Sequence, residues 1–549
     1  MNTTTRTQNA DPGTPRLPLW AAVAAGLLAV AAALAAGHLV AAIIDPFASP
    51  FLAVGNTAID LTPHPVKDFA IRTFGENDKI VLLAGMAFVI AAAAALAGLL
   101  SRRSPLPGTV LAAGLGLVGI VAVLARPTLG VTAALAPLAS LVVGVLVFRV
   151  LYRLAPRTPA AGSSTEAPGE VLAEAAVDGS DIPQTRPVDW HVPGLGRRRF
   201  LITSTAVAAA AGATAAAGQF IGGRVDVEAS RRSIRLTPDV TAPPIPAGAD
   251  FIGDGTPPFI TPNADFYRVD TALSVPRLRA QDWRLRVHGM VDRELVLTYD
   301  DLLNRPLVEK TISLCCVSNE VGGPYISTTD FIGVSLSDVL AEAGVRPGAD
   351  QLATRSVDGW TCGTPVEDIM RPGSDALLAL GMNGEPLPAE HGFPVRMVVP
   401  GLYGFVSATK WLVDAELTTF ADFDAYWVKR DWARRAPIKT MSRIDRPKAF
   451  EQVPAGRFVA AGVAWAQHKG IDKVEIRVDG GPWQSTSLST EVNVDTWRMW
   501  RAELDLPSGS HTLEVRATDR TGYTQTSERA EPIPDGAAGW HTIVFTARP

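Results

Sequence analysis

Long apolar runs dominate the first 225 residues of the chain, whereas shorter runs of alternating apolar and polar residues fill the rest. Each long run is close to the ~20 residues that an α-helix needs to cross a bilayer. A buried core helix is the alternative for any single run, but five of them in succession favour a helical membrane region of about five transmembrane helices. The runs are Leu17–Ile44, Ile80–Leu100, Thr109–Ala125, Leu129–Phe148 and Phe200–Gly223, of which the last is weaker because it is mostly Ala, Gly and Thr.

Basic residues between these runs predict the orientation of the helices. If the N-terminus is cytoplasmic, the ten arginines named at the end of this paragraph fall on the cytoplasmic side, as the positive-inside rule favours. The opposite loop, 45–79, is longer and carries charges of both signs. Five spans then place everything after Gly223 outside the cytoplasm, at the cell membrane. The arginines are Arg6, Arg16, Arg102, Arg103, Arg149, Arg153, Arg157, Arg197, Arg198 and Arg199.

The segment between the fourth and fifth runs differs from both neighbours. Residues 156–196 are rich in Ala, Pro, Ser, Thr and acids, which is typical of a disordered linker, here cytoplasmic. The four-helix part of the anchor is therefore expected in 1–155. The fifth helix, expected in 197–223, begins with GRRRFLITSTAVAAAAG, which resembles a twin-arginine export signal at an internal position; an ordinary positive flank is the alternative.

The second half of the chain is expected to form a tether and two domains. Residues 224–246 contain four prolines and are expected to be a tether. Residues 247–435 alternate irregularly between strand and helix patterns, which predicts an α+β domain. Thr298-Tyr-Asp-Asp and Ser335-Leu-Ser-Asp are predicted starts of capped helices, the second ending at Gly344.

Residues 436–549 carry only strand patterns separated by turn residues. Asp479-Gly480-Gly481 is a strong signal for a tight turn between two strands. About 110 residues of such strands are typical of a β-sandwich of immunoglobulin type. The pair of cysteines found in antibody domains is missing from this region.

Charge and cysteine content narrow the classes of function. The formal net charge is -5 and no Lys/Arg-rich face stands out, so nucleic acid is not an expected partner. Only three cysteines occur, Cys315, Cys316 and Cys362, and two of them are adjacent, which suits neither a disulfide framework nor a zinc site. This count favours one chemically special thiol.

Two distant segments carry the candidate chemistry. Residues 311–325, TISLCCVSNEVGGPY, place a cysteine at the end of a short strand, where a thiolate would be a soft metal ligand. Residues 391–411, HGFPVRMVVPGLYGFVSATKW, place a histidine, an arginine and a lysine around a Gly-rich turn that could hold a phosphorylated organic group. Together they indicate a metal carried on a phosphate-bearing cofactor.

Residues 245–549 resemble the sulfite oxidase family of molybdenum enzymes. The landmarks SLCCVSN, SVDGW, LGMNGEPLPAEHGFPVRMVVPGLYG, ATKW, GVAWAQ and VDGGPWQ keep the family order over about 300 residues. The resemblance implies a molybdopterin-binding oxidoreductase domain that carries molybdenum-molybdopterin and performs oxygen-atom transfer, followed by a dimerisation domain. The five-helix anchor is not part of the usual family pattern.

The resemblance also implies which residues form the site. Cys316 stands three residues before Asn319, as the family's metal-binding cysteine does, so Cys316 is the implied molybdenum ligand and catalytic residue. Cys315 and Cys362 are expected to be buried packing residues. Arg268 is the candidate for attracting an anionic substrate, with a plain surface arginine as the alternative. The implied cofactor-binding residues are Asn263, Tyr267, Arg268, Asp358, His391, Arg396, Ala408, Thr409 and Lys410.

Several alternatives remain open at this point. Family members that oxidise sulfite keep a tyrosine near the metal, and the matching position here is Phe423, so oxidation of a small oxyanion such as sulfite competes with reduction of an S-oxide or N-oxide. Electrons are expected to pass through a separate carrier, a cytochrome or a quinone. A homodimer is possible, and the helices imply contact with membrane lipid.

Two readings from other classes compete with an anchored enzyme. The soluble half could be a non-catalytic binding module on a membrane stalk. Alternatively, the anchor could itself pass electrons to quinone, with the loop that carries Asp60, His64 and Lys67 at the membrane interface.

Overall fold

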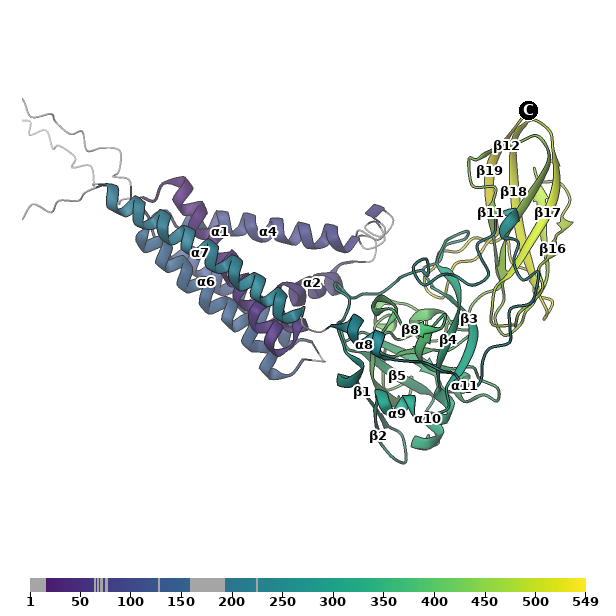
Figure 1. Cartoon of the computed structure of the whole chain (residues 1–549). Coiled ribbons are helices and arrows are strands. Elements are labelled where there is room, and N and C mark those ends of the chain that lie inside the picture. The colour runs from purple at the N-terminus through teal and green to yellow at the C-terminus, as the bar shows by residue number, and fades with distance from the viewer. Residues whose placement is uncertain are drawn as a thin grey trace, which may run out of the picture. The chain divides into compact units, whose positions relative to one another are not determined.

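The computed structural model divides the chain into two compact units, residues 1–224 and 225–549, which are described separately (Figure 1). It describes the following residues: 16–63, 66, 69, 73–74, 78–126, 129–157, 193–223 and 226–549. The expected cytoplasmic linker lies almost wholly outside these ranges, as do His64 and Lys67.

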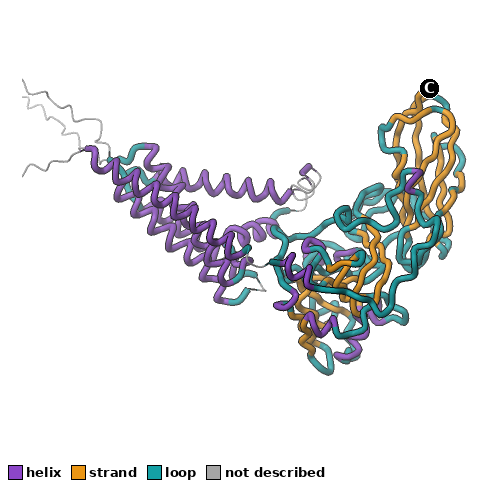
Figure 2. Tube along the Cα trace, in the orientation of Figure 1, coloured by secondary structure: helices purple, strands orange, loops and turns teal. Residues whose placement is uncertain are grey.

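Helices joined by short loops make up most of the described residues of the first unit (Figure 2). Five helices there are long and apolar enough to cross a membrane, which confirms the prediction from the apolar runs. A twelve-residue helix, α2, was not predicted. The Arg197–Arg199 motif lies within the first turns of α7. The α-helices are α1 (Leu19–Ile44), α2 (Pro50–Leu61), α4 (Asp78–Leu100), α5 (Leu106–Leu124), α6 (Leu135–Leu154) and α7 (Pro193–Gly222).

Small residues allow helices α1 and α4 to approach closely. A Cβ atom on Gly26 would lie 2.0 Å from the carbonyl oxygen of Ala94, and one on Gly98 would lie 2.0 Å from that of Ala22. Close backbone contact through Gly and Ala is the usual way in which helices associate where lipid removes the hydrophobic driving force. The packing of this unit therefore agrees with its apolar composition.

The second unit begins with a domain built on two five-stranded sheets. One sheet has the order β2-β1-β10-β5-β6, with β1 (Arg284–Gly289), β2 (Leu295–Thr298), β5 (Gln351–Ser356), β6 (Thr361–Pro365) and β10 (Leu412–Thr418). The other has the order β3-β4-β7-β8, with β9 paired to β7, and contains β3 (Val308–Cys315), β4 (Ile326–Ser335), β7 (Leu377–Met382), β8 (Glu385–Pro386) and β9 (Arg396–Val398). One apolar core joins both sheets.

Short capped helices link these strands as predicted. Helix α9 (Tyr299–Leu303) starts with a capping box between Thr298 and Asp301. Helix α10 (Leu336–Ala343) is capped by the Ser335 hydroxyl and ends at Gly344, whose φ of 74° favours glycine. Helix α11 (Val366–Met370) completes the set. Strands and helices of this kind support the α+β prediction for this region.

Two further sheets at the C-terminus enclose a second apolar core, so this domain is a β-sandwich. The tight turn predicted at Asp479-Gly480-Gly481 joins the antiparallel pair β14 and β15. The sheets are β11 (Met441–Arg446), β13 (Gly456–Trp465), β17 (Arg498–Leu506) and β16 (Ser487–Leu488) in one, and β12 (Gln452–Pro454), β19 (His541–Arg548), β18 (Gly509–Asp519), β14 (Ile471–Val478) and β15 (Gln484–Ser485) in the other.

The segment expected to be a tether is partly folded onto the α+β domain. Residues Val227–Ser233 form helix α8, and Asp226 caps its first turn. Arg231 donates hydrogen bonds to the carbonyl oxygens of Leu387 and Pro386 at 2.8 and 2.9 Å. The prolines that suggested a tether all follow this helix, which is why composition alone did not reveal it.

Candidate active site

Strand β3 carries the two adjacent cysteines to the edge of a loop. Cys315 pairs with Ile326 in the β3–β4 ladder, and the amide of Cys316 donates to the carbonyl oxygen of Tyr325 at 3.0 Å. The exposed fractions of Cys315 and Cys316 are only 1% and 9%. Because successive side chains of an extended chain point to opposite faces, the two thiols leave the strand in different directions.

The electrostatic surroundings of the two thiols differ accordingly. Burial raises the pKa of Cys316, while hydrogen bonds from Ser318 and the positive charge of Lys410 oppose that rise. Burial also raises the pKa of Cys315 well above its usual value, and there the opposing cation is Arg443. Lys410 is therefore the cation that acts on the Cys316 thiol and Arg443 of β11 the cation that acts on the Cys315 thiol, while both thiols also act on Tyr267.

Arg396, on β9, is a buried cation without an acidic partner. It is 4% exposed, and its Nη1 donates to the carbonyl oxygen of His391 at 3.1 Å. In the described part of the chain no carboxylate lies within ion-pair distance of its guanidinium, and its buried Nε has no acceptor. Burial lowers the pKa of Arg396 to about 10. A buried, unpaired cation is costly, so this position fits an anionic group of a ligand.

His391, in the short helix η6 (Ala389–His391), offers an acceptor to the same region. Its Nε2 lies 3.1 Å from the carbonyl oxygen of Asn263, which can only accept, so Nε2 carries the proton. Burial, with the nearby charges of Arg396 and Lys410, lowers the pKa of His391 to about 3, so the ring is neutral. Its buried Nδ1 has no partner and can accept a hydrogen bond from a ligand N–H or O–H.

Lys410 is held by a carboxylate that sequence reasoning missed. Its ammonium donates to Asp270 Oδ2 and to the carbonyl oxygen of Glu390, both at 3.0 Å. The same Oδ2 atom accepts from Arg268 Nε at 3.0 Å. Burial lowers the pKa of Lys410 to about 8, although Asp270 opposes this. In the sequence, Asp270 could be noticed only as an acid two residues after Arg268. Its other partner, Lys410, lies 140 residues further along the chain.

Gly392 makes the meeting of these cations possible. Its φ is 110°, and a Cβ atom there would lie 3.1 Å from both the Cβ of Arg396 and the Cα of Lys410. A side chain at this position would push the strand that carries Arg396 away from the segment that carries Lys410. The glycine of the His-Gly-Phe-Pro motif thus has a steric role in the site.

Tyr267 and Asp358 complete the buried part of the site. Burial raises the pKa of Tyr267 well above its usual value, and the thiols of Cys316 and Cys315 add to that rise. The Tyr267 ring stacks on Phe266 with centroids 5.4 Å apart. Asp358, in the turn after β5, accepts from the amide of Trp360 at 3.2 Å, and burial raises its pKa.

Three further residues singled out by the sequence, Thr409, Ala408 and Cys362, make their contacts within the protein. Thr409 is fully buried and its hydroxyl lies 2.7 Å from that of Thr354, so its side chain is engaged within the protein. The amide of Ala408 donates to the carbonyl oxygen of Gly404 at 2.9 Å, forming the predicted turn. Cys362 is completely buried, with its sulfur 3.6 Å from the Thr364 hydroxyl.

These groups suit the molybdopterin cofactor implied by the sequence. A pterin carries N–H donors for His391, its phosphate matches Arg396 and Lys410, and its metal accepts a soft thiolate such as Cys316. The unpaired Arg396 Nε and His391 Nδ1 are the orphaned atoms that such a ligand would satisfy.

Comparison with known proteins agrees with this assignment. Residues 272–427 match the family described as the oxidoreductase molybdopterin binding domain. The mitochondrial sulfite oxidase of Homo sapiens is 31% identical over 325 residues, which cover 50% of this chain and 58% of that protein. Nitrate reductase [NADH] 1 of Oryza sativa is 28% identical over 334 residues, which cover 49% of this chain and 36% of that protein.

A solved structure is similar to part of the chain. The sulfane dehydrogenase SoxCD from Paracoccus pantotrophus is 26% identical, with a TM-score of 0.47, over 53% of this chain and 84% of that one. The chain spans about three-fifths of the length of the human relative that it matches. Residues 272–427 are thus similar to the molybdopterin-binding domain of oxidoreductases, and about half of the chain is similar to sulfite oxidases.

Proposed function

We propose that this protein is a membrane-anchored oxidoreductase whose molybdopterin domain faces away from the cytoplasm and transfers an oxygen atom to or from a small substrate. The observation that carries the proposal is the convergence of the buried thiol of Cys316 with Lys410, His391 and the unpaired Arg396. The family match over 272–427 supports the same chemistry. The five apolar helices support a membrane anchor.

Each residue has a separate part in this proposal. Cys316 is the protein ligand of the molybdenum, whose cofactor supplies two-electron redox chemistry coupled to oxygen-atom transfer. Arg396 and Lys410 hold the anionic part of the cofactor, and Lys410 also favours the thiolate form of Cys316. His391 accepts a hydrogen bond through Nδ1, with its tautomer set by Asn263. Asp358 and the turn at Ala408 and Thr409 contact the pterin.

Arg268 is the proposed attractor of an anionic substrate. Its side chain is 38% exposed, unlike that of Arg396, so it can be reached from solvent while Asp270 holds it in place. The substrate is a small oxyanion such as sulfite, or an S-oxide or N-oxide that is reduced. Phe423 and Tyr426 lie beneath Lys429 and Arg430, at 5.7 and 3.6 Å from ring centroid to cation. These pairs favour neither direction of reaction.

The remaining parts of the proposal concern partners and placement. The positive-inside distribution of arginines supports an extracytoplasmic domain, and the Arg197–Arg199 segment suits export through a twin-arginine route. A separate cytochrome or quinone exchanges electrons with the site. The C-terminal sandwich is of immunoglobulin type and forms a homodimer.

Metal analysis tests the proposal most simply. Protein purified from molybdate-replete cells should contain about one molybdenum per chain and should turn over either sulfite or a sulfoxide with a one-electron dye. A reporter enzyme that is active only outside the cytoplasm should be active when it is fused to the C-terminus. Protein without molybdenum under these conditions would contradict the enzyme proposal, and a cytoplasmic reporter would contradict only the topology.

A further inference from the structure

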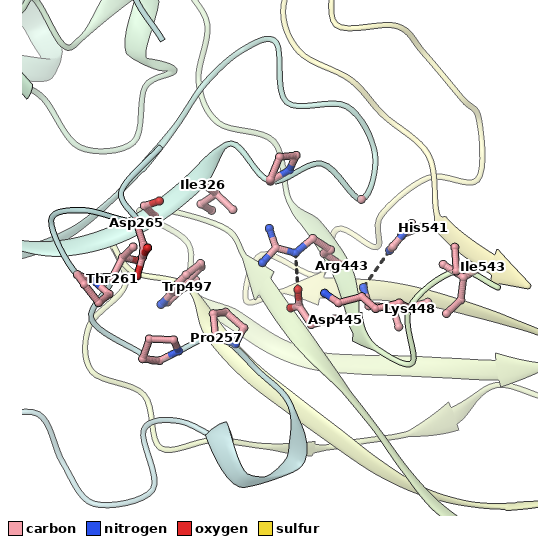
Figure 3. Close-up of a pocket in the computed structure, with 17 residues that line it drawn as sticks. Pro257, Thr261, Asp265, Ile326, Arg443, Asp445, Lys448, Trp497, His541 and Ile543 are labelled. Atoms are coloured by element: carbon pink, nitrogen blue, oxygen red, sulfur yellow. Dashed lines mark hydrogen bonds and ion pairs between the residues drawn. The ribbon is translucent and has the colours of Figure 1, made fainter. Parts of the chain in front are cut away.

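A pocket of about 480 Å³ lies between the α+β domain and the β-sandwich, within the second unit (Figure 3). One wall comes from the segment 257–265 and the start of β4, and the other from β11, β19 and Trp497. Proline, isoleucine and tryptophan side chains form much of the lining. This space is too large and too apolar for an inorganic ion alone, because an apolar wall gives such an ion no hydrogen bonds.

Arg443 brings a directed positive charge to this pocket. It is 8% exposed, its Nε donates to Asp445 Oδ1 at 2.9 Å, and its Nη1 donates to the carbonyl oxygen of Gly323 at 3.0 Å. Figure 3 shows Arg443 and Asp445 joined by this contact beside the cavity. Two anchored nitrogens fix the guanidinium plane, while Nη2 has no acceptor in the described part of the chain. A fixed guanidinium with one open edge is suited to an anionic head group.

His541 adds a neutral donor whose tautomer is set by the protein. The amide of Ile444 donates to His541 Nδ1 at 2.9 Å, so Nε2 carries the proton. A Cβ atom on Gly322 would lie 2.3 Å from Nε2, so the glycine leaves the room that this nitrogen needs. Among the described residues, nothing accepts the Nε2 proton. His541 therefore offers a hydrogen bond on the same side as Arg443.

Lys448 supplies a second positive charge at the rim. Its side chain is exposed, and its ammonium forms no ion pair in the described part of the chain. The acids that line the pocket are Asp445, whose Oδ1 accepts from Arg443 while its buried Oδ2 has no partner among the described residues, and Asp265, which is exposed to solvent. The donors without acceptors are thus Arg443 Nη2, His541 Nε2 and Lys448 Nζ, all beside an apolar wall.

We propose that this pocket is a binding site for a small organic anion, a molecule with an apolar body and a carboxylate or sulfonate head. The head is held by Arg443, His541 and Lys448, and the body lies against the prolines and Trp497. The site is separate from the Cys316 site, but the two share the loop after Cys316, because Tyr325 accepts from Cys316 and Pro324 lines the pocket. The proposal does not depend on the proposed function.

Calorimetry on the full chain in detergent tests this, with benzenesulfonate as the probe and benzamide as its neutral analogue. Benzenesulfonate should bind and benzamide should bind at least tenfold more weakly. Because Arg443→Gln removes a hydrogen bond between charged groups, it should weaken the binding of benzenesulfonate about tenfold or more. Lys448 is exposed, so Lys448→Gln should leave folding unchanged and weaken the binding of benzenesulfonate several-fold.

Arg457→Gln is the matched control, because Arg457 is exposed on β13 and lies outside the pocket. This variant should bind benzenesulfonate as the wild type does. If Arg443→Gln fails to fold, Lys448→Gln alone decides. Failure of benzenesulfonate to bind at millimolar concentration, equal binding of benzamide, or unchanged binding by Lys448→Gln would each overturn the proposal.

Discussion

Cys315 and Cys316 are consecutive residues whose thiols experience different cations. Burial raises the pKa of both thiols, but Arg443 of the β-sandwich opposes this at Cys315, whereas Lys410 of the cofactor-binding segment opposes it at Cys316. The family pattern predicts Cys316 as the metal ligand from its spacing to Asn319, and the cation beside its thiol favours the same residue, which stays a prediction. A thiolate at Cys316 would lie near Lys410, which together with Arg396 suits the phosphate of a cofactor.

Arg396→Met should separate cofactor binding from folding. In protein grown without molybdate, loss of a buried, unpaired cation should raise the free energy of unfolding by about 1–3 kcal/mol, because the desolvation cost disappears. In the molybdenum-loaded protein the same change should lower thermal stability and molybdenum content. Thermal unfolding of both forms measures this. Equal destabilisation of both forms would show that Arg396 is a purely structural residue.

Asp270→Asn should weaken the site through its neighbours. Asp270 Oδ2 accepts from both Lys410 and Arg268 at 3.0 Å, so the substitution removes the negative charge that the two cations share, while the Glu390 carbonyl oxygen still accepts from Lys410. Removal of one partner from a buried pair should lower the free energy of unfolding by about 3 kcal/mol. Asp505→Asn, at an exposed position, is the control. Indistinguishable unfolding curves for the two variants would contradict this role of Asp270.

His541 should make stability depend on pH. Burial and the charges of Arg443, Arg529 and Lys448 lower the pKa of His541 to about 4. The unfolded chain protonates this histidine near pH 6.5 and the folded chain only near pH 4, so stability is full above about 6.5 and falls as the pH drops toward 4. The loss should be about 2–3 kcal/mol.

Denaturation at several pH values measures this loss, and His541→Gln should reduce the slope between pH 6.5 and 4. Glutamine keeps an acceptor for the Ile444 amide but does not titrate in this range. A slope that is the same in wild type and variant would show that His541 is not the responsible group.

Much of the architecture follows from local pattern. Neighbouring residues in the sequence are enough to predict the five apolar helices, the capped helices at Thr298 and Ser335, and the turn at Asp479. Strand β4 was missed because its centre, Ser-Thr-Thr-Asp, reads as polar. Its polar groups pair across the ladder, as Thr311 does with Asp330 at 2.6 Å, and no local pattern shows this.

Only those site residues that lie within the family motifs could be predicted from the sequence. Cys316, His391, Arg396 and Lys410 could be named because the family landmarks keep their order. Asp270 could not be named, since its role comes from a contact with Lys410, 140 residues away in the sequence, that exists only in the folded chain. The interdomain pocket combines segments from 257 to 543 and was invisible for the same reason.

The sulfur coordination of the metal, measured by X-ray absorption at the molybdenum edge, tests the central claim most directly. The wild type and Cys315→Ser should show the same number of sulfur neighbours, while Cys316→Ser should lose one of them. Loss of a sulfur neighbour in Cys315→Ser, or an unchanged sulfur count in a molybdenum-loaded Cys316→Ser protein, would contradict the assignment of Cys316 as the metal ligand.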